Sequence, residues 1–218
     1  RSVSRGLGDV YKRQVQVSAY NKKTLNPYTG GTPMNMWTED LVLPEELRKE
    51  RLQKEPASYT AWILGKSGKT QEKKRKAVII CPGGGYEMLS YYSEGVQLAQ
   101  RMERDGGYKA FILSYRIQPN TYPQCQMDLA LAIMHVRAHA RQYGIDENRI
   151  LVVGASAGGH LCASTAMLHE ELKTEIFCVH PELVKLYGRI SARPDGVGLL
   201  YPVISFTSEY HEGSCRYN

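Results

Sequence analysis

The 218-residue sequence lacks long apolar runs and cysteine pairs, and each absence excludes a class of protein. Uninterrupted apolar stretches, such as residues 77–81 and 150–153, are only a few residues long. A membrane span needs roughly 18 or more such residues, so we expect none. The five cysteines are an odd number and form no Cys-x-x-Cys pair, which argues against a disulfide framework. Buried free thiols suit a reducing compartment, and we therefore expect a cytoplasmic protein.

The net charge of +6 does not describe a nucleic-acid-binding surface. It comes from two clusters, at residues 1–14 and 66–76, outside which the chain holds 18 basic and 20 acidic residues. No basic stretch is interleaved with aromatic side chains, as it is in nucleic-acid-binding proteins. We therefore expect no nucleic-acid partner.

Residues 4–14, SRGLGDVYKRQ, resemble a translated sequencing adapter. The transposon-end codons GAT GTG TAT AAG AGA CAG translate to residues 9–14, and adapter bases upstream of them give residues 4–8. A disordered basic tail is the alternative interpretation, but chance does not readily produce a match of this length. We assign residues 1–14 to an adapter-derived artefact and leave them out of the fold.

The rest of the chain divides into an irregular N-terminal segment, residues 15–57, and one domain, residues 58–218. Within the first segment, only residues 45–54 indicate a short surface helix. The domain alternates short strands with helices, which predicts an α/β fold with a mostly parallel, doubly wound sheet. We expect strands at residues 58–64, 77–81, 108–115, 149–154 and 196–204, the last four of them buried. Helices are expected at residues 96–103, from Pro123 to Gly144 with the apolar face Leu129, Ile133, Val136 and Ala140, and at residues 158–168.

The strongest chemical motif is the Gly-x-Ser-x-Gly sequence at residues 154–158, between an expected strand and an expected helix. A chain that turns sharply here needs small flanking residues, because larger side chains would clash with the neighbouring strand or helix. Such a turn raises the Ser156 hydroxyl into the crevice beyond the strand ends, beside a helix N-terminus. The motif predicts that Ser156 is a nucleophile, with a plain structural turn as the alternative.

A second glycine-rich motif, residues 82–86 (PGGGY), follows another buried strand. Consecutive glycines leave backbone N–H groups uncovered, so that they can approach an oxyanion. We predict that the N–H groups of Gly84, Gly85 and Ala157 form an oxyanion hole, which would contribute several kcal/mol to an acyl-transfer transition state. A flexible turn is the alternative.

Other motifs do not indicate chemistry. Residues 65–70 contain two Gly-Lys-Ser/Thr triplets, but Thr60 and Ile63 occupy the positions where a phosphate-binding loop needs glycine. Residues 154–158 fail as a dinucleotide-binding motif, because Ser156 replaces the second glycine. His160 lies in the first turn of the helix, which carries it away from Ser156, and we expect a packing role. No motif indicates a cofactor or a metal.

Together these segments resemble the α/β-hydrolase fold, in the branch of small carboxylesterases related to hormone-sensitive lipase and bacterial carbohydrate esterases. The resemblance rests on residues 82–86, Tyr115 and Arg116 with Pro119 and Pro123, residues 144–150, residues 154–160 and residues 201–204. It implies that Ser156 is the nucleophile and that Gly84, Gly85 and Ala157 are oxyanion donors. The segment 58–218 is then a partial α/β-hydrolase domain.

The resemblance also implies what the chain lacks. In this fold the catalytic acid follows the strand expected at residues 196–204, and the catalytic histidine comes later still. Asp195 precedes that strand, while Glu209, His211 and Glu212 lie just after it, and none of these matches a triad position. We therefore expect the chain to be C-terminally incomplete and inactive, because an unactivated serine loses roughly 10⁴–10⁶ in rate.

The expected activity of the parent protein is that of a carboxylic ester hydrolase, with a small acyl ester or a carbohydrate ester of the acetyl or xylan type as substrate. A peptidase or amidase of the same fold is the enzymatic alternative, and a non-catalytic, hydrolase-like binding protein is the other. The aromatic residues Tyr86, Tyr91 and Tyr92 are suited either to stack on a sugar or to fill the core. The oligomeric state is left open by the sequence.

Overall fold

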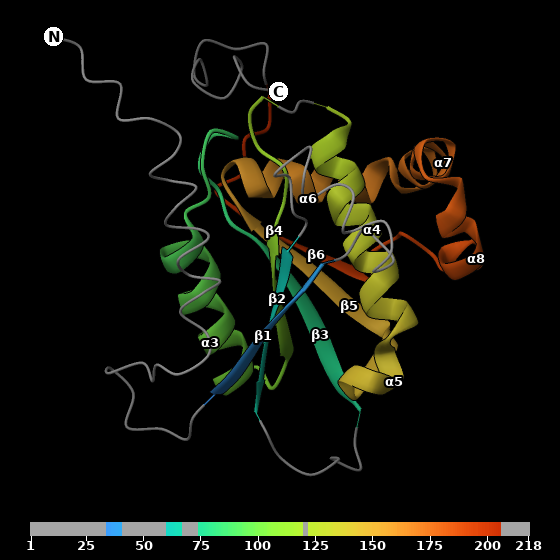
Figure 1. Ribbon diagram of the computed structural model, residues 1–218. Helices are drawn as coiled ribbons and strands as arrows, with labels where there is room; N and C mark the ends of the chain where they lie inside the picture. Colours follow the sequence, from blue (N-terminus) through green and yellow to red (C-terminus); the bar gives the residue numbers. More distant parts are fainter. Residues whose placement is uncertain (1–33, 41–59, 67–73, 120–121, 206–218) are drawn as a thin grey trace, which may run out of the picture.

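The computed structural model describes residues 34–40, 60–66, 74–119 and 122–205. One sheet runs through these residues in the strand order β1-β2-β4-β3-β5-β6 (Figure 1). Strands β4, β3, β5 and β6 pair in parallel, whereas β1 and β2 add to the β4 side in antiparallel pairs. The expectation of a mostly parallel α/β sheet is confirmed. The strands are β1 (Met34–Asp40), β2 (Thr60–Lys66), β3 (Arg75–Cys81), β4 (Lys109–Ser114), β5 (Ile145–Ala155) and β6 (Gly196–Leu200).

Helices cover both faces of this sheet, as a doubly wound fold requires. The π-helix η2 and helix α3 lie on one face, and α4 with the helices after it lies on the other (Figure 1). The helices switch from one face to the other where the strand order reverses, since β4 lies on one side of β3 and β5 lies on the other. The helical elements are η2 (Tyr91–Val96), α3 (Gln97–Arg104), α4 (Gln124–Ala138), α5 (Ala140–Tyr143), α6 (Ala157–Met167), α7 (His169–Val179), η3 (Pro181–Leu183) and α8 (Val184–Tyr187).

The central strands are apolar throughout because both of their faces are covered. In β3, Val78 and Ile80 pack with Ile112 beneath α3, whereas Ile79 packs with the α4 side of the core. This alternation follows the two-residue period of a strand. The buried strands expected at residues 77–81, 108–115 and 149–154 are therefore confirmed, and β5 begins four residues earlier than expected.

Helix α4 is buried on nearly every side. All residues from Cys125 to Val136 are shielded from solvent, because the sheet covers one side and α6, α7 and α8 cover the others. The expected single helix from Pro123 to Gly144 is broken at His139, and Gly144, in a left-handed conformation with φ 65°, ends the short α5 instead. Of the helices in the described part of the chain, none combines the length and apolarity that a membrane crossing requires.

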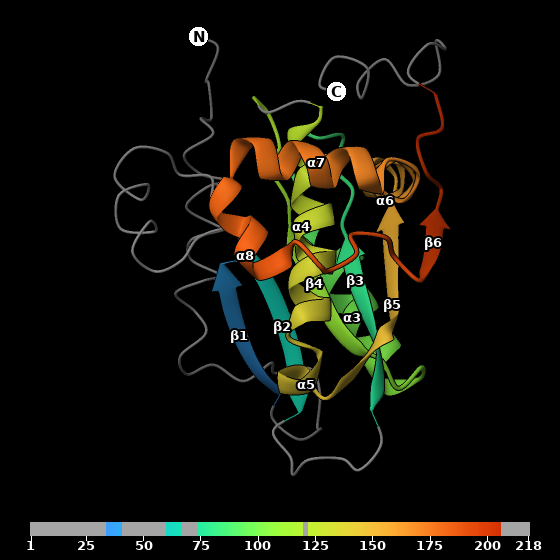
Figure 2. The same ribbon diagram turned by 90° about the vertical axis from the view of Figure 1, so that its right-hand side faces the viewer.

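Strand β6 departs from the sequence expectation. We expected a buried strand over residues 196–204, but β6 ends at Leu200 and occupies an edge of the sheet (Figure 2). Val197 and Leu199 are 41% and 42% exposed. An apolar sequence identifies a strand, but it does not show whether a neighbour covers that strand.

The opposite edge also differs from expectation. Strand β1 lies within residues 15–57, which we expected to be irregular, and it pairs with β2 from Met34 opposite Lys66 to Asp40 opposite Thr60. Residues 1–14, the expected helix at residues 45–54 and residues 67–70 of the glycine-lysine motif lie outside the described residues.

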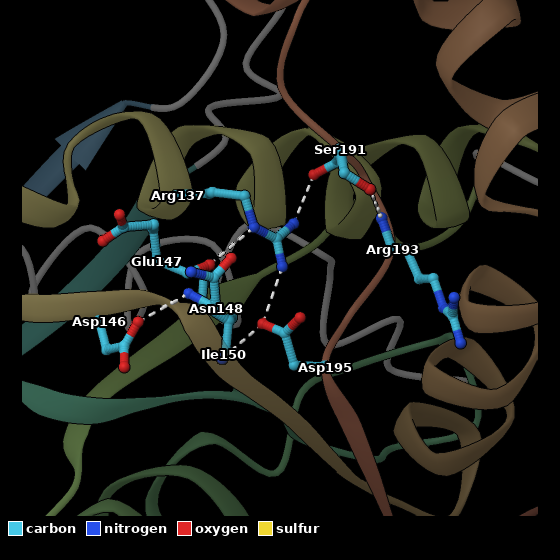
Figure 3. A network of polar contacts seen from close by, with 8 residues as sticks. All are labelled: Arg137, Asp146, Glu147, Asn148, Ile150, Ser191, Arg193 and Asp195. Carbon is cyan, nitrogen blue, oxygen red and sulfur yellow. Dashed lines mark hydrogen bonds and ion pairs between the residues drawn. The ribbon is translucent and has the colours of Figure 1, made fainter.

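A polar cluster fastens the amino end of β5 to α4 and to the segment before β6 (Figure 3). The Arg137 guanidinium donates to the carbonyl oxygens of Glu147 and Ser191 and pairs with Asp195 at 2.9 Å. The same Asp195 oxygen accepts the Ile150 N–H at 2.8 Å. Asp195 therefore has a structural role at the amino end of the sheet, where its position before β6 places it.

We expect Asp195→Ala to lower the free energy of unfolding by about 1–3 kcal/mol, because it leaves the Ile150 N–H and the Arg137 guanidinium without their acceptor. Urea unfolding followed by circular dichroism measures the change. Asp105→Ala is the matched control, since Asp105 forms an exposed ion pair with its neighbour Arg104 and its loss should leave the unfolding midpoint nearly unchanged. Equal midpoints for the Asp195 variant and the wild type would contradict the proposed role.

Candidate active site

Ser156 sits on a strained turn between β5 and α6. Its φ of 51° and ψ of −117° place a residue with a side chain in a region that non-glycine residues rarely adopt. Backbone hydrogen bonds hold it there: the Ser156 N–H donates to Leu200, while its carbonyl accepts the N–H groups of Gly159, His160 and Val203. The surrounding structure thus imposes the conformation that the Gly-x-Ser-x-Gly motif predicts.

The two outer glycines of the motif are required by close backbone packing. A Cβ atom built at Gly154 would overlap the carbonyl oxygen of Gly158, and one built at Gly158 would overlap that of Cys81. Cys81 and Gly154 are also paired across β3 and β5. The outer positions of the motif must therefore be glycine, because the first turn of α6 rests directly on the ends of two adjacent strands.

The glycine-rich loop after β3 lies against Ser156. A Cβ atom built at Gly83 would be 3.0 Å from the Ser156 Cβ and 2.6 Å from the Ala155 carbonyl oxygen. Gly84 and Gly85 have φ values of +134° and +65°, which a residue with a side chain adopts only at a cost. Within the described residues, their N–H groups donate to no acceptor. The two motifs that the sequence singled out separately thus form one site at the carboxyl ends of β3 and β5.

Comparison with known proteins identifies the family of this site. The BD-FAE family model matches residues 66–192, which is more than half of the chain. The chain belongs to the BD-FAE family. The matched region contains both glycine motifs and Ser156, and the chain has the α/β-hydrolase fold that the sequence resemblance implied.

Similar proteins include enzymes named for xylan and for acetyl esters. The chain is 36% identical over 147 residues to endo-1,4-beta-xylanase B of Butyrivibrio fibrisolvens and 29% identical over 143 residues to an acetylxylan esterase of Xylanibacter ruminicola. These matches cover 66% and 64% of this chain but only 22% and 25% of the relatives. A solved acetyl ester-xyloside bifunctional hydrolase from Caldicellulosiruptor lactoaceticus matches with 31% identity and a TM-score of 0.61, covering 85% of this chain and 64% of that one. The chain thus spans about a quarter of these two curated relatives.

Three hydrogen bonds hold the glycine-rich loop after β3 in place. The Tyr115 hydroxyl donates to the Pro82 carbonyl at 2.6 Å, and the Tyr86 carbonyl accepts the Gln118 N–H at 2.9 Å. The Tyr86 hydroxyl lies 2.7 Å from Nδ1 of His160. Tyr86 is fully buried in this arrangement, so it is a core residue. Of the two roles that the sequence left open for it, stacking on a sugar is therefore wrong.

The His160 ring connects the loop to α6 through the Tyr86 hydroxyl and is not bonded to the Ser156 hydroxyl, which agrees with its expected packing role. Burial lowers its pKa below the ordinary value. The positions of Arg116 and Asp128 are also structural, since the Asp128 carboxylate accepts both the Arg116 N–H and its guanidinium. Near the start of β5, the Asp146 side chain accepts the Asn148 N–H at 3.0 Å.

Sequence reasoning missed Glu94. From the single turn of η2, its Oε2 accepts the Gly83 N–H at 2.6 Å and its Oε1 accepts the Tyr201 hydroxyl at 3.0 Å. The available signal was weak: one acidic residue in the first helical turn after a glycine-rich loop. Tyr201 was identified only as part of the resemblance, and with a φ of 35° it joins Ser156 and Tyr86 among the non-glycine residues that have a positive φ.

Cysteine and metal chemistry find no support in the described residues. Burial raises the pKa of Cys81 and raises that of Cys125 to about 12, so both stay protonated at neutral pH. Cys162 is also buried, whereas Cys178 is exposed. In the described ranges, no group of three or more His, Cys, Asp or Glu residues is arranged to bind a metal ion.

We expect Gly158→Ala to destabilise the protein by about 1–3 kcal/mol or more, because its Cβ would displace the carbonyl of Cys81 from α6. Urea unfolding measures the loss. Gly196→Ala serves as the control, since its Cβ would meet only the end of the Leu151 side chain, at 3.1 Å. If both variants lost the same stability, the close packing of α6 on β3 would not be the cause.

Acidification should weaken the protein partly through His160. Its pKa in the folded state lies below the unfolded value of about 6.5, so the unfolded state binds more protons. This contribution is fully present above that value and is lost as the pH falls below it. Between about pH 7.5 and 5.5, urea unfolding should show a smaller loss of stability in His160→Gln than in the wild type. Tyr86→Phe should keep the wild-type dependence, because burial causes the shift.

Proposed function

We propose that the chain carries the nucleophile and the oxyanion hole of a serine hydrolase that cleaves carboxylic esters. The observation that supports this most strongly is the strained Ser156, held between β5 and α6 and in contact with the glycine loop. A strained residue that the surrounding structure imposes is typical of a functional site. A purely structural turn does not explain why a loop with uncovered N–H groups lies against Ser156.

In the proposed reaction, the Ser156 oxygen attacks the ester carbonyl and its proton passes to a general base. The carbonyl oxygen becomes an oxyanion that accepts hydrogen bonds from the N–H groups of Gly84, Gly85 and Ala157. The tetrahedral intermediate expels the alcohol, which takes up the proton, and leaves an acyl group on Ser156. Water then cleaves this acyl-enzyme by the same steps, and the acid and the free serine are released.

The proposed substrate is an acetylated carbohydrate or a small acyl ester. The names of the relatives from Butyrivibrio, Xylanibacter and Caldicellulosiruptor support the carbohydrate. A sugar substrate is also consistent with two exposed aromatic rings, since Tyr92, on the same η2 as Glu94, and Tyr201, which is bonded to Glu94, are 60% and 67% exposed. Tyr91 packs against the core beneath α3 and offers no such surface.

We also infer that the 218 residues by themselves are inactive. Within the described part of the chain, no histidine ring is hydrogen-bonded to the Ser156 hydroxyl, and the His160 ring is bonded to the Tyr86 hydroxyl. Without a base, roughly 10⁴–10⁶ in rate is lost. A chain extended along its reading frame beyond residue 218 is therefore the form to assay for ester hydrolysis.

We expect the extended protein to hydrolyse p-nitrophenyl acetate and to release acetate from acetylated xylo-oligosaccharides, and Ser156→Ala to abolish both activities. Acetate release and nitrophenolate absorbance measure them. Ser164→Ala is the matched control, because this serine lies on the same helix, where its hydroxyl donates to carbonyls of α6 and accepts from the Gln126 side chain of α4, so its loss should leave the rate unchanged.

Each alternative has a distinct outcome. Turnover that survives Ser156→Ala would overturn the nucleophile assignment, and Ser156-dependent turnover by the 218-residue chain would overturn its inferred inactivity. Cleavage of a p-nitroanilide but not of the ester would favour an amidase. A reading frame that supplies neither an acid nor a histidine beyond residue 218 would favour a binding protein.

A further inference from the structure

The Glu94 carboxylate joins three segments of the chain beside Ser156. It accepts a hydrogen bond from the loop after β3 and another from the segment after β6, while its own backbone belongs to η2. We propose that Glu94 is a positioning residue that fixes the glycine loop for oxyanion binding, and that Tyr201 acts through it. The inference rests on the proposed ester hydrolysis and adds two residues to the machinery of that site.

Gly83 is the point at which the carboxylate holds the loop. The 2.6 Å bond from its N–H to Oε2 of Glu94 is short, as expected for an amide that donates to a charged acceptor. There is no room for the loop to approach Ser156 more closely, since a Cβ at Gly83 would be 2.8 Å from Glu94 Oε2 and 3.0 Å from the Ser156 Cβ. Glu94 and Ser156 thus confine Gly83 between them.

This bond determines which amides are left for a substrate. The Gly83 N–H is used by Glu94, and the Gly83 and Gly84 carbonyls accept the N–H groups of Ser90, Glu87 and Met88. The N–H groups of the two following glycines, Gly84 and Gly85, stay uncovered within the described residues. Glu94 therefore orients the peptide immediately before the proposed donors.

Tyr201 makes the arrangement depend on β6. Its hydroxyl donates to Oε1 of Glu94 at 3.0 Å, and the residue before it, Leu200, accepts the Ser156 N–H. The end of β6 thus contacts the nucleophile turn through its backbone and the oxyanion loop through a side chain. Each carboxylate oxygen of Glu94 accepts one of these hydrogen bonds. Glu94 therefore sets the spacing between the glycine loop and the end of β6.

A carboxylate so close to a developing oxyanion would repel it if it faced the reacting atoms. Glu94 instead directs one oxygen to a backbone amide and the other to a phenol. Its effect on the reaction is therefore expected through the loop geometry, not through contact with substrate.

The first test uses amide hydrogen exchange, which needs no activity. In the 218-residue chain, we expect the Gly83 amide to exchange more slowly than those of Gly84 and Gly85. Glu94→Ala should remove this protection, while Glu94→Gln, which keeps one acceptor oxygen, should retain much of it. Amides of β3 and β5 report whether each variant is folded. Equal exchange of Gly83 in the wild type and in a folded Glu94→Ala variant overturns the proposal.

The second test uses the extended protein with p-nitrophenyl acetate. We expect Glu94→Ala to lower kcat about tenfold to 100-fold with little change in KM, which is less than the loss of an oxyanion donor itself. The Ki of phenylboronic acid, which forms a tetrahedral serine adduct, should rise by a similar factor. This rise separates a displaced loop from a smaller folded fraction, because a Ki does not depend on how much enzyme is folded.

Tyr201→Phe completes a double-mutant cycle with Glu94→Ala. If Tyr201 acts through Glu94, its substitution lowers kcat in the wild-type background and has no further effect in Glu94→Ala. Gln97→Ala, an exposed residue one turn further along, is the control and should leave kcat unchanged. Additive effects of Tyr201→Phe and Glu94→Ala overturn the part assigned to Tyr201.

The outcomes distinguish this inference from the proposed function. An extended wild-type protein without Ser156-dependent turnover overturns the proposed function, and the catalytic role of Glu94 falls with it. Normal turnover, together with unchanged kcat and unchanged Ki in Glu94→Ala, overturns the role of Glu94 alone.

Discussion

The ends of β3 and β5 meet at Cys81 and Gly154, where the backbone of α6 rests on the strands with no side chain between them. Every other feature of the site depends on this close approach. It places the first turn of α6 directly beyond the sheet, it forces Ser156 into a left-handed conformation, and it leaves the loop after β3 in contact with that residue. A larger residue at position 154 or 158 would separate the layers and remove the turn together with its strain.

The parts that the sequence could predict are those governed by local pattern. Apolar runs such as residues 77–81 identify strands buried on both faces, and the two glycine motifs locate the carboxyl ends at which a site forms. Glycine at 154 and 158 could be explained before the structure was known, because a sharp turn between packed elements tolerates little else. Asp195 could be excluded from the site on its position before β6 alone.

What the sequence could not predict depends on contacts between distant segments. Glu94 and Gly83 are eleven residues apart, and Tyr201 and Glu94 are 107 apart, so no periodicity connects them. The exposure of β6 follows from its place in the strand order, which the apolar sequence does not specify. Likewise, Tyr86 and Tyr92 are the same residue type in neighbouring segments, yet Tyr86 fills the core against His160 and Tyr115 while Tyr92 faces solvent.

The Ser156 amide is bonded to the carbonyl of Leu200 in the edge strand. An edge strand with exposed side chains opens locally at a lower free energy than the core unfolds, as observed for peripheral segments of many proteins. When β6 detaches, Ser156 loses a constraint on its strained backbone and can relax, although α4 and the central strands remain folded. Among the described residues, the nucleophile turn is therefore bonded to the strand that opens most readily, while the core that carries it consists of the central strands. Circular dichroism of the helices would register a folded protein after the site had already been lost.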